Sequence, residues 1–334
     1  WLFNRNLAAA EEMLREKFAK KPEIAAANIT VLNAGYDYGH NIHASVSTTY
    51  TVDSKSTKEA GKYMDINGNK ATSYGFIAAA EKSGLRLYLG SYPITPATDV
   101  LHELSKHKSL GVVTVQAEDE IAGCASAVGA AFAGALAITS TSGPGVCLKS
   151  EAMNLAVIAE LPLVVLNVQR GGPSTGLPTK SEQTDLLQAL YGRNGESPMP
   201  VIAAKSPGDC FDSAFMACKM AVEHMTPVVL LTDAFIANGS AAWKLPNLEE
   251  YPTITPPYVT ADMAGKWTPF MRNEETGARY WALPGTEGFA HRIGGLEKSN
   301  ETGAISTEPE NHNLMTRLSQ EKVDRIPVPD VEVE

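Results

Sequence analysis

The chain has 334 residues, 44% of them hydrophobic and 20% charged, a composition that is ordinary for a globular protein of about two domains. Its formal net charge of −10 argues against nucleic acid or an anionic membrane as a partner, because both favour clustered Lys and Arg. The longest uncharged run, residues 121–148, is rich in Gly, Ala, Ser and Thr and contains SGPG, so it does not predict a membrane span. No export signal is evident, and a cytoplasmic setting is expected.

The N-terminal part predicts one helix and little else. Residues 7–20 (LAAAEEMLREKFAK) carry apolar residues at helical spacing among strong helix formers, which predicts a helix. The stretch from 33 to about 68 has no clean period. A piece of about 60 residues is marginal as an independent domain. We therefore expect residues 1–67 to be an appendage.

From about residue 70, short apolar runs alternate with helical stretches. The predicted strands are 85–90, 111–116, 135–141, 162–168, 201–204 and 227–233, and the predicted helices are 70–82, 97–107, 119–133, 147–159, 182–191 and 208–224. Near-continuous apolar strands that alternate with helices predict a parallel sheet covered on both faces. The expected fold is an α/β doubly wound domain over residues 68–244. Residues 245–334 are rich in Pro, Gly and charge and predict an extended wrap that ends in a helix at 312–326.

Ligands of such sheets bind beyond the carboxyl ends of the strands, in the loops that lead into the helices. Four loops therefore lie at one edge: SYPITPAT, AEDE, TSGPG and QRGGPSTGLPTKSEQ. We expect the site there.

Common catalytic motifs are absent from the sequence. It contains no P-loop, no G-x-S-x-G and no Rossmann G-x-G-x-x-G after a strand, so nucleotide hydrolases, common esterases and nicotinamide dehydrogenases lose support. Four scattered cysteines and seven histidines show no metal-ligand spacing, which predicts small buried thiols and no metal site on this chain.

Three acids, Glu118, Asp119 and Glu120, begin a helix made of small residues. Acids in a first turn can simply cap the helix and face its positive dipole end. The same acids also follow a predicted strand, so they can point into the expected cleft.

Three motifs resemble a known family. EIAGCASAVG (120–129), followed by TSGPG (141–145), resembles the pyrimidine-binding domain of thiamine diphosphate enzymes. The chain is further similar to the α subunit of 2-oxoacid:ferredoxin oxidoreductases through YPITPAT (92–98), QAEDEIAG (116–123) and RGGPSTGLPTKSEQTDL (170–186). The last two motifs look most like the 2-oxoglutarate branch.

The resemblance implies that Glu120 is the acid that shares a proton with N1′ of the pyrimidine and so promotes loss of the C2 proton. Such a group needs a raised proton affinity, which burial among Ala, Gly and Ser would supply. Glu118 and Asp119 then remain as caps. Gly143 and Pro144, in the TSGPG turn, are expected to contact the cofactor.

The resemblance also implies a substrate site. Thr95, stiffened between two prolines, is expected near the reacting carbonyl of the 2-oxo acid. Arg170 suits a substrate carboxylate by its fork geometry. Thr175, Thr179 and Lys180, in the same loop, are expected to read a distal carboxylate, although packing of the loop is an equal reading.

The family holds diphosphate and Mg²⁺ through a GDG motif, and only PGDC (207–210) comes near it. We read PGDC as a helix cap. The resemblance therefore implies a partner β subunit that carries the diphosphate, Mg²⁺ and [4Fe-4S] sites, with coenzyme A, ferredoxin and a 2-oxo acid as reactants. Residues 1–67 resemble the end of a γ domain, and residues 245–334 the approach to a further, missing domain.

The expected reaction is oxidative decarboxylation of 2-oxoglutarate with coenzyme A to succinyl-CoA. Three alternatives stay open: a subunit for pyruvate or a branched-chain 2-oxo acid, a non-oxidative thiamine diphosphate decarboxylase or transferase, and a scaffold that only docks partners.

Overall fold

The computed structural model describes residues 1–42, 49–52, 58–177 and 180–328. The chain divides into two compact units, Trp1–Ala60 and Gly61–Glu334. Strand β1 (Tyr63–Asn67) pairs antiparallel with β8 (Ser240–Lys244). Residues 61–67 therefore pack with the second unit rather than with the N-terminal one.

The N-terminal unit contains two helices, α1 (Ala8–Lys17) and α2 (Pro22–Asn41). The first confirms the helix predicted at 7–20. The second was not predicted, because it buries only Ala25 and Gly39 and so shows no apolar stripe at helical spacing.

The second unit is built on a six-stranded sheet with the strand order β3-β2-β4-β5-β7-β6. All neighbouring pairs are parallel. The strands are β2 (Leu87–Ser91), β3 (Val113–Gln116), β4 (Leu136–Thr141), β5 (Leu163–Gln169), β6 (Val201–Ala203) and β7 (Pro227–Asp233). Each corresponds to a predicted strand, and the α/β prediction is confirmed.

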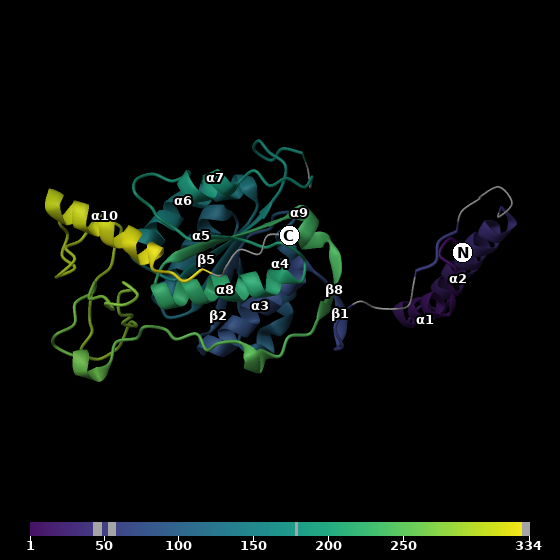
Figure 1. Cartoon of the computed structure of the whole chain (residues 1–334), viewed down its shortest axis with the longest axis horizontal. Coiled ribbons are helices and arrows are strands. Elements are labelled where there is room, and N and C mark those ends of the chain that lie inside the picture. The colour runs from purple at the N-terminus through teal and green to yellow at the C-terminus, as the bar shows by residue number, and fades with distance from the viewer. Residues whose placement is uncertain (43–48, 53–57, 178–179, 329–334) are drawn as a thin grey trace. The chain divides into compact units, whose positions relative to one another are not determined.

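Helices cover both faces of this sheet, as Figure 1 shows. On one face lie α3 (Gly68–Ser83), α4 (Thr98–Leu104) and α8 (Asp209–His224), which share a core with side chains such as Leu89, Ile138 and Leu230. On the other lie α5 (Glu120–Phe132), α6 (Gly143–Ile158) and α7 (Leu186–Tyr191), packed against side chains such as Ala137 and Val165. Successive strand residues thus enter opposite cores, which explains the continuous apolar runs.

Two helices begin four residues away from their predicted starts. Helix α6 begins at Gly143 rather than at 147, so Gly143 and Pro144 form its first turn and not a separate turn before it. Proline suits that position because its missing N–H would have no helical partner. Helix α7 begins at Leu186 rather than at 182, because Gln183 and Asp185 bond the sheet edge instead. Helix α9 (Ala234–Asn238), β1 and β8 were not predicted.

The C-terminal segment is extended, as predicted, with short 3₁₀ turns at Leu248–Glu250 and Ala261–Met263 and a final helix α10 (Pro309–Asp324). A buried carboxylate anchors it to the sheet domain. Glu160, just after α6, accepts hydrogen bonds from Arg272 Nη1 at 2.6 Å and from Lys322 Nζ at 2.7 Å. Arg279 Nε donates to the main-chain oxygen of Glu160 at 3.0 Å.

Within the described ranges, no helix has both the length and the apolar character needed to cross a membrane.

Candidate active site

The sheet reverses its winding direction at β2. Strand β3 lies on one side of β2 and the next strand, β4, lies on the other, which opens a crevice at their carboxyl ends, where α/β sheets bind ligands. Polar contacts bridge the two strands there. Ser91 Oγ lies 2.6 Å from Ser140 Oγ, and the Tyr92 hydroxyl lies 2.8 Å from Thr141 Oγ1. All four side chains are buried, so the crevice has a polar floor.

The three acids differ in position. Asp119 is the N-cap of α5, and its Oδ1 accepts a hydrogen bond from Ala122 N at 2.8 Å. Glu118 is exposed before the helix. Glu120 is the first helical residue and is partly buried. Asp119 therefore caps the helix and Glu118 faces solvent. Of the three acids, only Glu120 is directed into the crevice.

The Glu120 side chain packs against the crevice floor. A Cβ placed on Gly145 would come within 3.1 Å of Glu120 Cγ and would overlap the Tyr92 hydroxyl and Thr141 Oγ1. Burial raises the pKa of Tyr92, and the neighbouring Glu120 carboxylate raises it further. Tyr92 therefore stays protonated and can donate to Glu120. The carboxyl is less buried in this chain than the small residues around it suggested.

Sequence reasoning missed Lys149, a fully buried residue of α6. Its Nζ donates to Thr139 Oγ1 at 2.9 Å and to the main-chain oxygen of Glu120 at 3.1 Å. It also lies 5.0 Å from the centroid of the Tyr92 ring. Burial lowers the pKa of Lys149 to about 8, while Cys124 and Glu120 oppose that shift.

Arg170 and the YPITPAT loop meet at the same edge. Arg170 directly follows β5, is 8% exposed, and donates from Nη1 to the main-chain oxygen of Thr95 at 2.8 Å. Its Nε is buried and has no hydrogen-bond partner. The Thr95 side chain is exposed. Asn69 of α3 holds the next residue of the loop through its bond to Pro96 O at 3.0 Å, which no sequence motif indicated.

A cavity of about 390 Å³ lies beside these residues. Three predicted site residues line it: Gly143, Pro144 and Arg170. Cys147, Asp185 and Gln188 line it as well, and sequence reasoning had not selected them as site residues. Asp185 Oδ2 accepts from Asn167 Nδ2 at 2.9 Å and lies against the first turn of α6, where a carboxylate favours the positive dipole end. Helices α6 and α7 and the loop after β5 line this cavity, and neither Glu120 nor Thr95 is among its lining residues.

The loop after Arg170 folds back on itself. Gly171 N donates to Lys180 O at 2.8 Å, and Gly172 N donates to Glu182 Oε2 at 2.9 Å. Thr175 and Lys180 are exposed and do not line the cavity. Thr179 lies outside the described residues.

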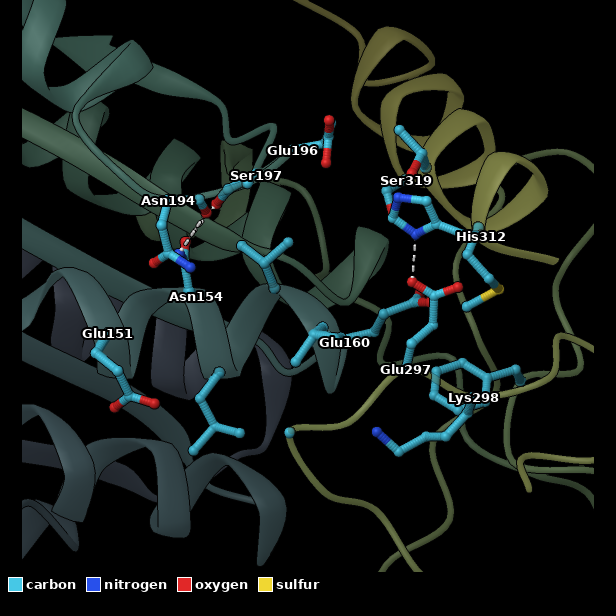
Figure 2. A pocket seen from close by; sticks show the side chains of 18 residues that line it. Glu151, Asn154, Glu160, Asn194, Glu196, Ser197, Glu297, Lys298, His312 and Ser319 are labelled. Atoms are coloured by element: carbon cyan, nitrogen blue, oxygen red, sulfur yellow. Dashed lines mark hydrogen bonds and ion pairs between the residues drawn. The ribbon is translucent and has the colours of Figure 1, made fainter. Parts of the chain in front are cut away.

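A second cavity, of about 320 Å³, lies at the opposite end of α6. Figure 2 shows Glu151 and Asn154 of α6 on one side and His312 of α10 on the other, with His312 bonded to Glu297 at 2.6 Å. This cavity lies where the C-terminal segment packs against the sheet domain. It lies at the edge of the sheet away from Glu120.

The cysteines are free thiols. Cys124, Cys210 and Cys218 are buried as predicted, whereas Cys147 is exposed at the cavity and accepts a hydrogen bond from Gln188 Nε2 at 2.8 Å. Across the residues that the structure describes, no three His, Cys, Asp or Glu side chains are grouped so that they could hold a metal ion.

The chain is similar to several proteins of one kind. Over its whole length it is 56% identical to the 2-oxoglutarate oxidoreductase subunit KorA of Mycobacterium tuberculosis. The matched region makes up 50% of that relative. Over 55% of its length it is 41% identical to the 2-oxoglutarate synthase subunit KorA of Archaeoglobus fulgidus, of which it covers 52%. The chain thus spans about half the length of these relatives.

A solved structure has the same fold. The 2-oxoglutarate:ferredoxin oxidoreductase from Magnetococcus marinus, with 2-oxoglutarate, coenzyme A and succinyl-CoA bound, superposes on 97% of the chain with a TM-score of 0.84 and 35% identity, and 55% of that protein's chain is covered. The family model described as pyruvate flavodoxin/ferredoxin oxidoreductase, thiamine diphosphate-binding, matches residues 79–310. The chain therefore belongs to the pyruvate flavodoxin/ferredoxin oxidoreductase family and carries its thiamine diphosphate-binding domain.

Proposed function

We propose that this chain is the α subunit of a 2-oxoglutarate:ferredoxin oxidoreductase, which converts 2-oxoglutarate, coenzyme A and oxidised ferredoxin to succinyl-CoA, carbon dioxide and reduced ferredoxin. The observation that carries the proposal is the position of the Glu120 carboxyl at the switch point of the sheet, with Arg170 directly after β5 at the same edge. The relatives named above support the choice of 2-oxoglutarate.

The crevice residues fit the pyrimidine end of thiamine diphosphate. Glu120 offers a carboxyl that can exchange a proton with a ring nitrogen, and it lies above a floor of hydroxyl groups. The buried Ser142 Oγ, at the N-cap of α6, has no hydrogen-bond partner and is available to a polar ring substituent. When bound, the cofactor supplies the carbon nucleophile and the electron sink for decarboxylation.

Each residue then has a distinct task. Glu120 holds a proton at N1′ of the pyrimidine, and the Tyr92 hydroxyl steadies its carboxylate. Arg170 binds the substrate carboxylate with the donors that Thr95 O leaves free. The Thr95 hydroxyl, in the loop whose main-chain oxygen Arg170 binds, orients the reacting carbonyl. Gly143 and Pro144 form the wall that faces the cofactor.

The distal carboxylate of the substrate needs its own partners. Thr175, Thr179 and Lys180 remain candidates for this contact, since they share the loop that begins at Arg170.

The remaining parts are assigned to a partner. We infer a β subunit that supplies the diphosphate, Mg²⁺ and [4Fe-4S] sites, since PGDC opens α8 as a local cap: Asp209 Oδ2 accepts from Lys205 N at 2.8 Å. We also infer that residues 1–60 end a γ-like domain, that residues 245–334 lead to a further domain, and that the enzyme works in the cytoplasm.

The test is an assay of the complex of this chain with its β subunit. We expect reduction of a low-potential dye that requires both 2-oxoglutarate and coenzyme A, and that is at least ten-fold slower with pyruvate or a branched-chain 2-oxo acid.

Other outcomes would select the alternatives. Equal rates with pyruvate would contradict the choice of substrate. Release of carbon dioxide without dye reduction would indicate a non-oxidative decarboxylase. A complex that binds no thiamine diphosphate would indicate a scaffold.

A further inference from the structure

Lys149 has an environment that a lysine rarely occupies. Its side chain is fully buried on α6, enclosed by β4, by the first turn of α5 and by the Tyr92 ring. Long cationic side chains usually extend to solvent, because removing an ammonium from water is costly. The groups around the buried Lys149 ammonium must therefore compensate for its loss of hydration.

Lys149 links Glu120 to the sheet. One N–H of Nζ bonds the main-chain oxygen of Glu120 at 3.1 Å, and another bonds Thr139 Oγ1 in the sheet at 2.9 Å. The first turn of α5 is thereby tied to β4. The Tyr92 ring, whose hydroxyl interacts with the Glu120 carboxylate, lies 5.0 Å from the same ammonium.

The charges around Lys149 are unequal. Glu120, Asp119 and Cys124, all on α5 or at its N-cap, interact with the ammonium. Asp119 is exposed and its carboxylate caps the helix, and burial raises the pKa of the Cys124 thiol to about 11, so the thiol stays neutral. Tyr92 also stays neutral. Glu120 is therefore the partly buried anion that the ammonium affects most.

We propose that Lys149 is a positioning residue for Glu120: its ammonium fixes the main chain of Glu120 from below and acts as a buried positive charge near the carboxyl. This inference rests on the proposed function of Glu120 and extends it to a residue beneath the crevice.

The protein offers a matched control. Lys322 is also buried, and burial lowers its pKa to about 8 as well. It pairs with Glu160, which follows the other end of the 16-residue helix α6, about 24 Å from the first turn at the usual helical rise. Lys322→Met thus removes a comparable ammonium without touching the crevice.

The experiment compares Lys149→Met, Lys149→Gln and Lys322→Met in the complex with the β subunit. Calorimetry on the cofactor-free complex gives the dissociation constant of thiamine diphosphate, and kcat/KM for 2-oxoglutarate is followed against pH. We expect both Lys149 variants to bind thiamine diphosphate about ten-fold more weakly, and their acid limb to move up by about one pH unit, since loss of a nearby cation favours the protonated carboxyl. Lys149→Gln keeps an N–H donor for Thr139 and tests the same shift if the Met variant does not assemble.

Lys322→Met should leave the acid limb and the cofactor affinity at their wild-type values, even if its melting temperature falls. Wild-type affinity and an unmoved acid limb in the Lys149 variants would overturn this inference alone and leave Lys149 as a structural residue. A wild-type complex that binds no thiamine diphosphate would overturn the proposed function and this inference together.

Discussion

Arg170 Nη1 donates a 2.8 Å hydrogen bond to the main-chain oxygen of Thr95, although the two residues are 75 positions apart in the chain. The bond joins the loop after β2 to the end of β5 across the intervening β4. It leaves Nε buried and without a hydrogen-bond partner. The guanidinium therefore both supports the Thr95 loop and retains donors for an anionic ligand.

Arg170→Lys should raise KM for the 2-oxo acid and lower kcat/KM by about 10–100-fold, the effect of losing a charge-assisted bidentate contact. Steady-state kinetics of the complex would measure it. Arg86→Lys is the control, because Arg86 is exposed and precedes β2 at the opposite edge of the sheet. Equal kinetics in the two variants would exclude Arg170 from substrate binding.

Thr95→Val should lower kcat about ten-fold, because its hydroxyl is assigned to the reacting carbonyl, whereas Thr95→Ser should keep most of the activity. The exposed side chain of Thr95 predicts little change in melting temperature for either variant. Single-turnover kinetics would separate the chemical step from binding. A Val variant as fast as the Ser variant would show that the hydroxyl is not used.

Gly145→Ala should destabilise the protein by about 1–3 kcal/mol, the usual effect of overpacking, and weaken cofactor binding. A Cβ at this position would overlap Thr141 Oγ1 and the Tyr92 hydroxyl. Gly129→Ala, in α5, meets nothing within 4 Å and should stabilise the helix by up to about 1 kcal/mol. Chemical denaturation gives both values, and a neutral Gly145→Ala would mean that the crevice floor can move.

The buried ion pairs of Glu160 with Arg272 and Lys322 should make the free energy of unfolding of the second unit depend on pH in the acidic range. Burial alone would raise the pKa of Glu160, but Lys322 and Arg272 lower it from 4.5 to about 2. The ion pairs therefore stabilise the fold fully above about pH 5, and this contribution is lost as the pH falls towards 2. Glu160→Gln should lower the melting temperature strongly at pH 7, because it leaves Arg272 and Lys322 without a counter-charge.

The difference between wild type and Glu160→Gln should shrink steadily from pH 5 to pH 2 in melting experiments. Glu151→Gln, an exposed acid of α6, serves as the control and should follow the wild type at every pH. A constant difference across this range would contradict the assignment of the lowered pKa.

The strands could be predicted from the sequence because each is buried on both faces. Short apolar runs such as LVVLNVQ in β5 are typical of a strand that is buried on both faces. The edge that holds Glu120 and Arg170 followed from the parallel order, and the roles of both residues came from resemblance to a family. Helix α2 could not be predicted, because it buries almost nothing and its Gly and Asn residues weaken the helical pattern.

Lys149 shows why the rest of the site stayed hidden. In the sequence it lies in LKSEAM, beside Ser150 and the exposed Glu151, and such a stretch is typical of a solvated helix face. Its burial depends on Thr139 and Glu120, which approach only when α5 and α6 pack on β4. Asp185 likewise falls inside the predicted helix 182–191, and its contact with Asn167 depends on how β5 packs beside it.

Glu120 alone among the three acids is expected to be catalytic. The most direct test compares Glu120→Gln with Glu118→Gln in the complex with the β subunit, by coenzyme A-dependent reduction of a low-potential dye with 2-oxoglutarate. A proton-sharing acid contributes about 10²–10⁴-fold in rate. We expect a loss of that order for Glu120→Gln and near-wild-type activity for Glu118→Gln. Near-wild-type activity in both variants would contradict it and reduce Glu120 to a helix-capping acid.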